Sequence, residues 1–162
     1  MTKNGLDGST IPPASNAAML KFLSIAGYLA MMGGLLGLWF TRQVLSASLL
    51  VITPQALAVA LMLWARVTFG RRSFHAVANP TAGGLVTNGP YRLIRHPIYT
   101  AVCLFTWSGV LSHWSWSSAL LGFVVLAGAL VRLFIEEPMV SKQYPEYRAY
   151  SSRTWRMIPF VF

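Results

Sequence analysis

Long runs of apolar residues without charge dominate the chain. Nineteen uncharged residues run from Phe22 to Phe40, and twenty-two run from Val44 to Ala65. A third run, Pro97 to Leu133, is broken only by Arg132 and by a polar stretch at 112–115. A transmembrane helix needs about 20 apolar residues, so the third run has room for two helices. The pattern predicts an all-α integral membrane protein with about four transmembrane helices.

Composition excludes other classes of protein. Of the 162 residues, 55% are hydrophobic and 10% are charged, whereas a soluble domain carries about 25% charged residues. The net charge is +9, but the basic residues lie between apolar runs instead of gathering on one polar face, so we expect no nucleic-acid partner. The single cysteine, Cys103, has no ligand partner at metal-binding spacing, and no metal site is predicted.

The chain is expected to hold a flexible tail at 1–17 and one membrane-embedded domain at 18–162. Pro54 interrupts the second run, and since proline breaks a helix interior, we expect that span to begin near Pro54. The third helix, of about 15 residues, is roughly 22 Å long and shorter than the 30 Å hydrocarbon core. The predicted helices are 22–40, 54–69, 97–111 and 116–135, followed by a polar, aromatic tail with helix-compatible stretches at 138–162.

The distribution of charge predicts the orientation. With four spans, twelve of the Lys and Arg residues share one side of the membrane and Arg42 alone lies on the other. The positive-inside rule then places both termini and the basic, turn-rich loop 66–96 in the cytoplasm. Three of the four acidic residues, Glu136, Glu137 and Glu146, lie at the same face. We therefore expect any functional site there.

The first candidate segment runs from Asn88 to Tyr99. Asn88-Gly89-Pro90 is a turn signal, and Pro97 suits the first position of a helix. The start of that helix would present backbone N–H groups flanked by Arg95 and His96, an arrangement that favours anion binding. A membrane-interface cluster, in which arginine snorkels and tyrosine anchors, explains the same residues.

The second candidate is at the end of the fourth helix. Arg132 and Glu136 are four residues apart and share one helical face, and Glu137 lies next to them. A local ion pair of about 0.3–0.5 kcal/mol is one explanation. Carboxylates close to a membrane interior are costly, however, and this favours a functional role.

Four segments together resemble the isoprenylcysteine carboxyl methyltransferase family, which is related to the membrane phospholipid N-methyltransferases. They are Gly83–Tyr91, Arg95-His96-Pro97-Ile98-Tyr99, Arg132 with Glu136-Glu137, and Arg156-Met157-Ile158-Pro159. The resemblance covers roughly residues 57–160. It implies an enzyme that binds S-adenosylmethionine at the cytosolic face and takes a lipophilic acceptor from the bilayer.

The resemblance also implies roles for individual residues. Arg132 would face the acceptor, and Glu137 completes the paired-acid motif; these two are the predicted catalytic residues. The predicted cofactor-binding residues are Leu85, Val86, Tyr91, Arg95, His96, Pro97, Tyr99 and Glu136. Arg95 and His96 suit the cofactor's carboxylate, and Glu136 or Glu137 suits its ammonium or its ribose hydroxyls.

The sequence departs from the family pattern at Ala101, where the family usually has glycine, and in the tail Tyr144-Pro145-Glu146-Tyr147, where an aromatic-glycine pair is common. An isoprenylcysteine-type carboxylate is the favoured acceptor. A phospholipid amine is the alternative, because the chain holds both an arginine for a carboxylate and glutamates for an amine. A family member that binds lipid or cofactor without catalysis is a further alternative. A small transporter is disfavoured because no acid lies near the middle of a span.

Overall fold

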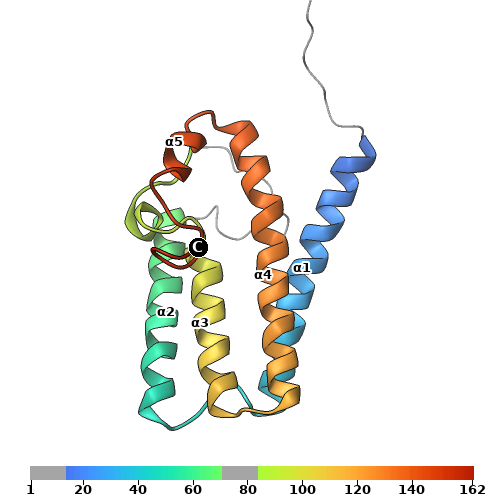
Figure 1. The fold of residues 1–162 in the computed structure, drawn as a ribbon, viewed down its shortest axis with the longest axis vertical. Helices are drawn as coiled ribbons and strands as arrows, with labels where there is room; N and C mark the ends of the chain where they lie inside the picture. Colours follow the sequence, from blue (N-terminus) through green and yellow to red (C-terminus); the bar gives the residue numbers. More distant parts are fainter. Residues whose placement is uncertain (1–13, 71–83) are drawn as a thin grey trace, which may run out of the picture.

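The computed structural model describes residues 14–70 and 84–162, with side chains from Ala18 onward. Within these two ranges, four long helices and two short ones follow one another: α1 (Ala14–Phe40), α2 (Leu49–Phe69), η2 (Gly89–Arg92), α3 (Pro97–Ser112), α4 (Trp116–Gln143) and α5 (Tyr147–Ser151). In Figure 1 the long helices run side by side, with α5 and the C-terminus toward one end and the short connections at 41–48 and 113–115 at the other. We call the end that carries α5 the α5 end.

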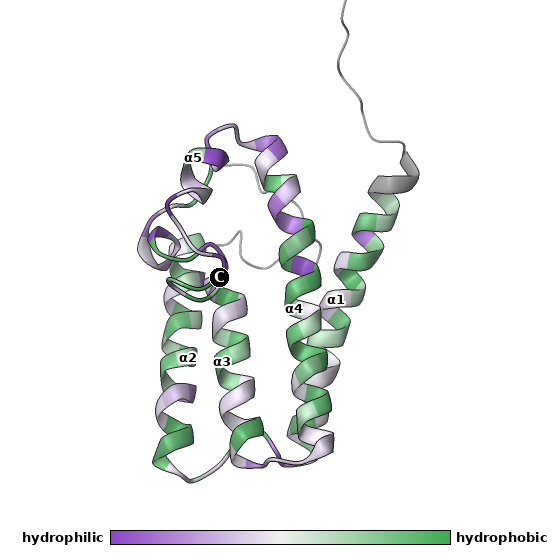
Figure 2. Cartoon of the chain, in the orientation of Figure 1, coloured by the Kyte–Doolittle hydropathy of each residue, from purple (hydrophilic) through white to green (hydrophobic). Residues whose placement is uncertain are grey.

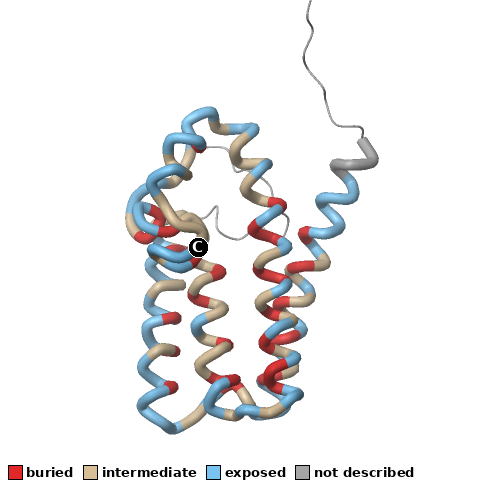
Figure 3. The backbone as a smooth tube through the Cα atoms, viewed as in Figure 1, coloured by how far each residue is buried: buried red, intermediate tan, exposed pale blue. Residues whose placement is uncertain are grey.

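The helices have the length and surface of membrane spans. Three segments, Ala18–Phe40 of α1 and the whole of α2 and α4, are long and apolar enough to cross a bilayer, and α3 is a shorter apolar helix. Large apolar side chains cover the outside; Leu50 is 87% exposed and Trp116 is 91% exposed. Apolar residues dominate the four helices in Figure 2, and buried positions lie on their inward faces in Figure 3. The predicted all-α integral membrane fold is confirmed.

The helical hairpin at 112–115 is where the sequence placed it, but three other boundaries differ. Helix α1 begins at Ala14, inside the predicted tail; residues 1–13 and the loop residues 71–83 lie outside the described part of the chain. The predicted start of the second span at Pro54 is wrong, because α2 begins at Leu49. Pro54 lies in the second turn, where it removes only the hydrogen bond to the Leu50 carbonyl.

Helix α4 continues past the predicted end at Ile135, through Pro138, to Gln143. A proline inside a helix forgoes one backbone hydrogen bond and does not always end the helix. Helix α4 is thus 28 residues long and α3 is 16, a difference of about 18 Å at 1.5 Å per residue. Helix α4 therefore extends beyond the start of α3 toward the α5 end, where it forms a wall on one side of the space next to that start.

Glycines allow a close crossing between α1 and α4. A Cβ atom built on Gly128 of α4 would lie 2.5 Å from the Gly27 carbonyl oxygen of α1, so no side chain fits between the two backbones. Small residues at such crossings let membrane helices approach closely. Helix α1 packs on α4, α4 on α3 and α3 on α2. The order of packing leaves α1 and α2 at the two ends of the row.

The C-terminal segment returns to the start of α3. Ile94 and Trp155 form an isolated parallel β-bridge, and the backbone N–H groups of Arg95 and His96 donate to the carbonyls of Trp155 and Arg156 at 2.7 and 2.9 Å. The Thr100 hydroxyl donates to the Met157 carbonyl at 2.8 Å. These bonds fix the backbone that carries Arg95 and His96.

Candidate functional site

The first cluster of the site joins α3 and α4. The Tyr99 hydroxyl donates to Oε1 of Glu136 at 2.6 Å, and Nη2 of Arg132 donates to the same oxygen at 2.9 Å. Nε of Arg132 also donates to the Tyr99 oxygen at 2.8 Å. The predicted contact between Arg132 and Glu136 is therefore present, and Tyr99 completes a closed triangle of hydrogen bonds.

Arg132 also ties the cluster to α1. Its Nη1 atom donates to the Ser24 carbonyl oxygen at 3.3 Å, and its guanidinium lies 5.5 Å from the centre of the Tyr28 ring. Arg132 is 5% exposed. These acceptors and the Glu136 carboxylate compensate the charge of the buried arginine, because an uncompensated charge is costly away from water.

The second cluster is centred on Glu137. Nε of Arg95 donates to its Oε1 atom at 2.9 Å, and Nε of Arg156 donates to its Oε2 atom at 3.0 Å. Nη1 of Arg95 also donates to the carbonyls of Ser151 and Thr154 at 2.7 and 2.6 Å. Glu137 thus holds the C-terminal segment against the start of α3.

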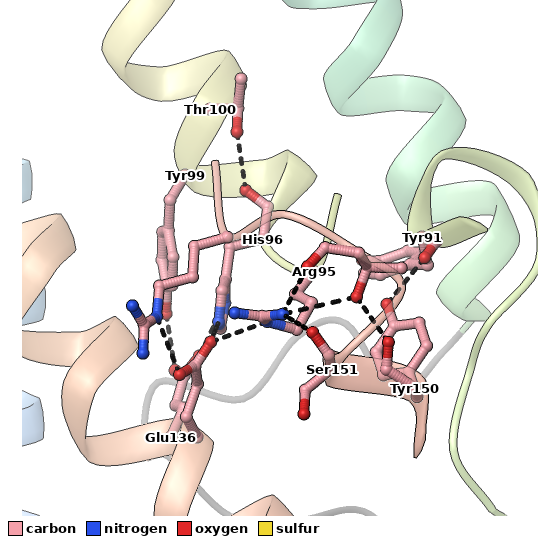
Figure 4. Close-up of polar contacts among 11 residues, drawn as sticks. Tyr91, Arg95, His96, Tyr99, Thr100, Glu136, Tyr150 and Ser151 are labelled. Atoms are coloured by element: carbon pink, nitrogen blue, oxygen red, sulfur yellow. Dashed lines mark hydrogen bonds and ion pairs between the residues drawn. The ribbon is translucent and has the colours of Figure 1, made fainter. Parts of the chain in front are cut away.

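His96 lies between the two glutamates. Its Nε2 atom is 3.4 Å from Oε1 of Glu137, and its Nδ1 atom is 4.0 Å from Oε2 of Glu136. The imidazole stacks on the Tyr99 ring, with the ring centres 5.6 Å apart and the planes 18° from parallel. Figure 4 shows His96 and Tyr99 side by side, both directed toward Glu136.

Tyrosines from the C-terminal region form another side of the site. The Tyr150 hydroxyl donates to the Tyr91 carbonyl oxygen at 2.7 Å, as Figure 4 also shows. Burial raises the pKa of Tyr150 to about 12 and raises the pKa of Tyr91 and Tyr147 further. All three phenols are therefore neutral hydrogen-bonding groups at physiological pH.

These side chains surround one cavity of about 430 Å³, within the range of roughly 300–1,000 Å³ typical of small-molecule sites. All ten residues predicted from the sequence line it: Leu85, Val86, Tyr91, Arg95, His96, Pro97, Tyr99, Arg132, Glu136 and Glu137. Gly84, from the segment Gly83–Tyr91 of the family resemblance, lines it too, whereas Gly83 lies outside the described residues.

Sequence reasoning missed three further groups of lining residues. Helix α1 contributes Tyr28, Met31, Met32 and Leu35, and α2 contributes Met62, Arg66 and Phe69. The extension of α4 and the tail contribute Met139, Val140, Tyr144, Tyr147 and Tyr150. The first two groups follow helical spacing, a signal present in the sequence but shared with every core-facing helix. The tyrosines at 144, 147 and 150 repeat every three residues and could have been singled out.

Ala101, the departure from the family pattern, is 1% exposed and is not part of the cavity lining. Its methyl group therefore lies within the helix packing and does not reshape the cavity wall directly. Among the described residues, no group of three or more His, Cys, Asp and Glu side chains could hold a metal ion.

Comparison with known proteins gives two findings. The model of the phospholipid methyltransferase family matches residues 43–147. The nickel-cobalt-cadmium resistance protein NccN of Alcaligenes xylosoxydans xylosoxydans is 30% identical over 125 residues, which make up 75% of this chain and 52% of that protein. The chain thus spans about half the length of this curated relative. No solved structure matches the chain.

Proposed function

The chain belongs to the phospholipid methyltransferase family of membrane enzymes, and from this premise we propose that it transfers a methyl group from S-adenosylmethionine to a small lipophilic acceptor. Members of this family generally use that cofactor. The observation that carries the proposal is that the ten predicted residues, drawn from three separate segments, line one cavity. The cavity lies toward the α5 end, where the basic residues would face the cytoplasm under the positive-inside rule.

The cavity has the chemistry that the cofactor requires. Oε1 of Glu136 accepts hydrogen bonds from Tyr99 and Arg132, while Oε2 lies 4.0 Å from His96, beyond hydrogen-bond distance. Oε2 of Glu136 can therefore accept a hydrogen bond from the ammonium or a ribose hydroxyl. Leu85, Val86 and Tyr91 supply apolar and aromatic surface for the adenosine. His96 and the first turn of α3 are the nearest groups for the carboxylate.

Arg95 lines the cavity and also makes contacts within the protein. Its donors contact Glu137 and two backbone carbonyls, so it holds the tail and the start of α3 together. We propose that Arg95 and Glu137 shape the cavity wall that receives the cofactor and that Arg132 orients the acceptor.

When bound, S-adenosylmethionine would supply a methyl group on a positively charged sulfur for transfer to an oxygen or nitrogen of the acceptor. The protein must align acceptor and methyl group and exclude water. Its apolar lining and neutral tyrosines suit the second task. Arg132 and Glu136 fix one another, so the acceptor would meet a preorganised surface.

We propose a carboxylate of the isoprenylcysteine type as the first candidate acceptor, because arginines surround the two glutamates and favour an anion. We propose a phospholipid amine as the second candidate, in keeping with the description of the matched family as phospholipid methyltransferases. For an amine, Oε2 of Glu136 would be the polar group that orients it.

Two measurements test the proposal. Calorimetry on the detergent-purified protein should detect binding of S-adenosylmethionine or its demethylated product, and absence of binding at high micromolar ligand would refute the proposed cofactor. Incubation with methyl-labelled cofactor and a lipid extract, followed by mass spectrometry, should identify a methylated lipid. Cofactor binding without any labelled product would instead support a non-catalytic, lipid-binding role.

A further inference from the structure

A loop near the C-terminus exposes apolar side chains next to the start of α3. In residues 157–162, Ile158 is 53% exposed, Phe160 is 82% exposed and Val161 is 77% exposed. The Ile158 N–H donates to the Phe162 main-chain oxygen at 2.8 Å, and the Phe162 N–H donates back to the Ile158 carbonyl at 3.0 Å. Figure 1 shows the C-terminus beside the N-terminal end of α3. The exposed apolar surface therefore belongs to a closed loop with a defined place in the fold.

The backbone at the tip of this loop is strained. The Val161 N–H donates to the Ile158 carbonyl at 3.2 Å, which closes a β-turn. Pro159 is the second residue of that turn, and Phe160 is the third with a φ of 66°, a conformation in which turns favour glycine or asparagine. The Phe160 ring contacts Trp155, with ring centres 4.6 Å apart, but most of it stays exposed. A strained backbone that presents a phenyl group is unfavourable in water, so this tip indicates an apolar surrounding.

The lengths of α3 and α4 place the loop within the thickness of a bilayer. The residues just before α3 pair with Trp155 and Arg156, and the 16 residues of α3 measure about 24 Å. On α4, Phe134 contacts Phe162 with ring centres 6.5 Å apart, and it lies about 27 Å from the start of that helix at Trp116. An exposed tryptophan at that start is typical of a membrane interface. Since the hydrocarbon core is about 30 Å thick, both distances put the loop at the opposite edge of that core.

The loop also continues the apolar outer surface of α4. Phe134 is exposed on that surface, and Phe162 packs on it edge to face. The Arg156 guanidinium lies over both rings, 5.7 and 5.2 Å from their centres. Arg148 and Arg153, on the segment that leads into the loop, are exposed, and arginines at such a boundary suit headgroup phosphates. An apolar tip bordered by arginines fits the acyl chains and phosphates of a bilayer.

The loop adjoins one wall of the candidate site. The backbone N–H groups of Arg95 and His96 donate to the carbonyls of residues 155–156, directly before the loop. The first residue of the loop, Met157, accepts a hydrogen bond from the Thr100 hydroxyl at 2.8 Å. Whatever holds the loop therefore also holds the backbone that carries His96.

We propose that the 157–162 loop is an interfacial anchor. Its turn inserts among the acyl chains at the edge of the hydrocarbon core, and this contact with lipid keeps the backbone of Arg95 and His96 in place. Burial of the Phe160 ring in hydrocarbon offsets the strain of its backbone. The partner of this surface is the bilayer itself, so the anchor involves neither cofactor nor acceptor and does not depend on the proposed function.

Fluorescence quenching locates the loop. The full chain, in a Cys103→Ala background, carries one cysteine labelled with a fluorophore and is placed in lipid discs. At Val161→Cys we expect quenching by nitroxide groups on the acyl chains, comparable to that at Leu57→Cys, an exposed position in the middle of α2. Gln143→Cys is the aqueous control, because Gln143 is exposed and lies about 40 Å along α4 from Trp116. Quenching by nitroxide should be several-fold weaker there, and quenching by aqueous iodide several-fold stronger.

Two results would overturn the proposal. Iodide quenching at Val161→Cys as strong as that at Gln143→Cys would place the loop in water. Protection from both quenchers would show that protein covers the loop, either a second copy of the chain or another segment.

Hydrogen exchange in lipid discs separates the anchor from the turn. Asparagine is favoured at a positive φ, so if Phe160 served only the turn, Phe160→Asn would leave exchange at the backbone N–H groups of Arg95 and His96 unchanged or slower. Loss of the anchor predicts faster exchange at both groups, by about tenfold for one buried aromatic side chain. Unchanged or slower exchange would contradict the anchor.

A second variant removes apolar surface without touching the contact between Phe160 and Trp155. Val161→Asn should also speed exchange at Arg95 and His96, whereas Leu50→Asn, which removes an exposed apolar side chain from α2, is the matched control and should not. An effect confined to Phe160→Asn would assign the change to the Trp155 contact and overturn the proposal.

Discussion

Replacing Glu136 by glutamine tests the cofactor assignment most directly. In the wild-type chain, Oε1 of Glu136 accepts hydrogen bonds of 2.6 and 2.9 Å from Tyr99 and Arg132, and Oε2 lies 4.0 Å from His96. Glutamine can keep an oxygen on the side of Tyr99 and Arg132. It then places an NH₂ donor where Oε2 was, and it removes the negative charge.

The expected magnitude follows from this geometry. A ligand ammonium or hydroxyl that donates to Oε2 makes a hydrogen bond to a charged group, which contributes about 1.5–3 kcal/mol. Loss of that bond raises the dissociation constant of S-adenosylmethionine roughly 10- to 150-fold. The NH₂ group of glutamine would face donor groups of the ligand. If the glutamine side chain rotated to present its oxygen to the ligand instead, it would lose a contact to Tyr99 or Arg132.

Calorimetry with S-adenosylmethionine and with its demethylated product measures this change in purified protein. Glu146→Gln is the matched control, because Glu146 is exposed and does not line the cavity. Thermal melts without ligand show whether the variant is folded, since Glu136→Gln also leaves Arg132 with a neutral partner. Normal cofactor affinity in a folded Glu136→Gln protein would refute the assignment of Glu136 to the cofactor.

Three further changes follow from the same contacts. Arg132→Ala should raise the KM for the acceptor and, because it leaves the Glu136 carboxylate without its cation, lower stability by about 3–5 kcal/mol in a denaturation assay. Ala101→Gly should cost about 1 kcal/mol through helix propensity and leave cofactor affinity unchanged in calorimetry, since Ala101 does not line the cavity. Gly128→Ala should destabilise the crossing with α1 by about 1–3 kcal/mol, because its Cβ would lie 2.5 Å from a backbone oxygen. Gly33→Ala is the control, because a Cβ at Gly33 would have nothing within 4 Å. Equal melting temperatures for the two variants would contradict the close crossing of α1 and α4.

The helices could be predicted because their apolar runs are long and uncharged, a signal that depends on composition alone. Their ends could not be predicted equally well, because prolines act through single hydrogen bonds. Pro54 and Pro138 both lie inside helices, and neither ends one. At each position the helix forgoes one bond and continues. Reading Pro54 as a boundary made the second predicted helix too short, and the predicted end at Ile135 made the fourth too short as well.

Only the site residues that belong to sequence motifs could be predicted from the sequence. Tyr99 and Glu136 both belong to segments that the family resemblance covers, and the structure joins them at 2.6 Å. The contribution of α1 could not be foreseen, since it depends on the crossing at Gly27 and Gly128, which brings the Ser24 carbonyl within 3.3 Å of Arg132. A contact of that kind is set by tertiary packing between helices more than a hundred positions apart.

The short third helix connects the fold to the proposed chemistry. Helix α3 has 16 residues against 28 in α4, so its N-terminal turn, with His96 and Tyr99, begins well below the end of α4. The C-terminal segment, through Trp155 and Arg156, fills part of the space between the start of α3 and the end of α4. The rest of that space is the cavity. Charged and hydrogen-bonding groups are thereby held between the start of α3 and the extension of α4, and each glutamate has a cation within 4.0 Å. An acceptor with an apolar chain could then reach these groups without leaving the bilayer, which is the condition that methyl transfer to a lipid imposes on a membrane enzyme.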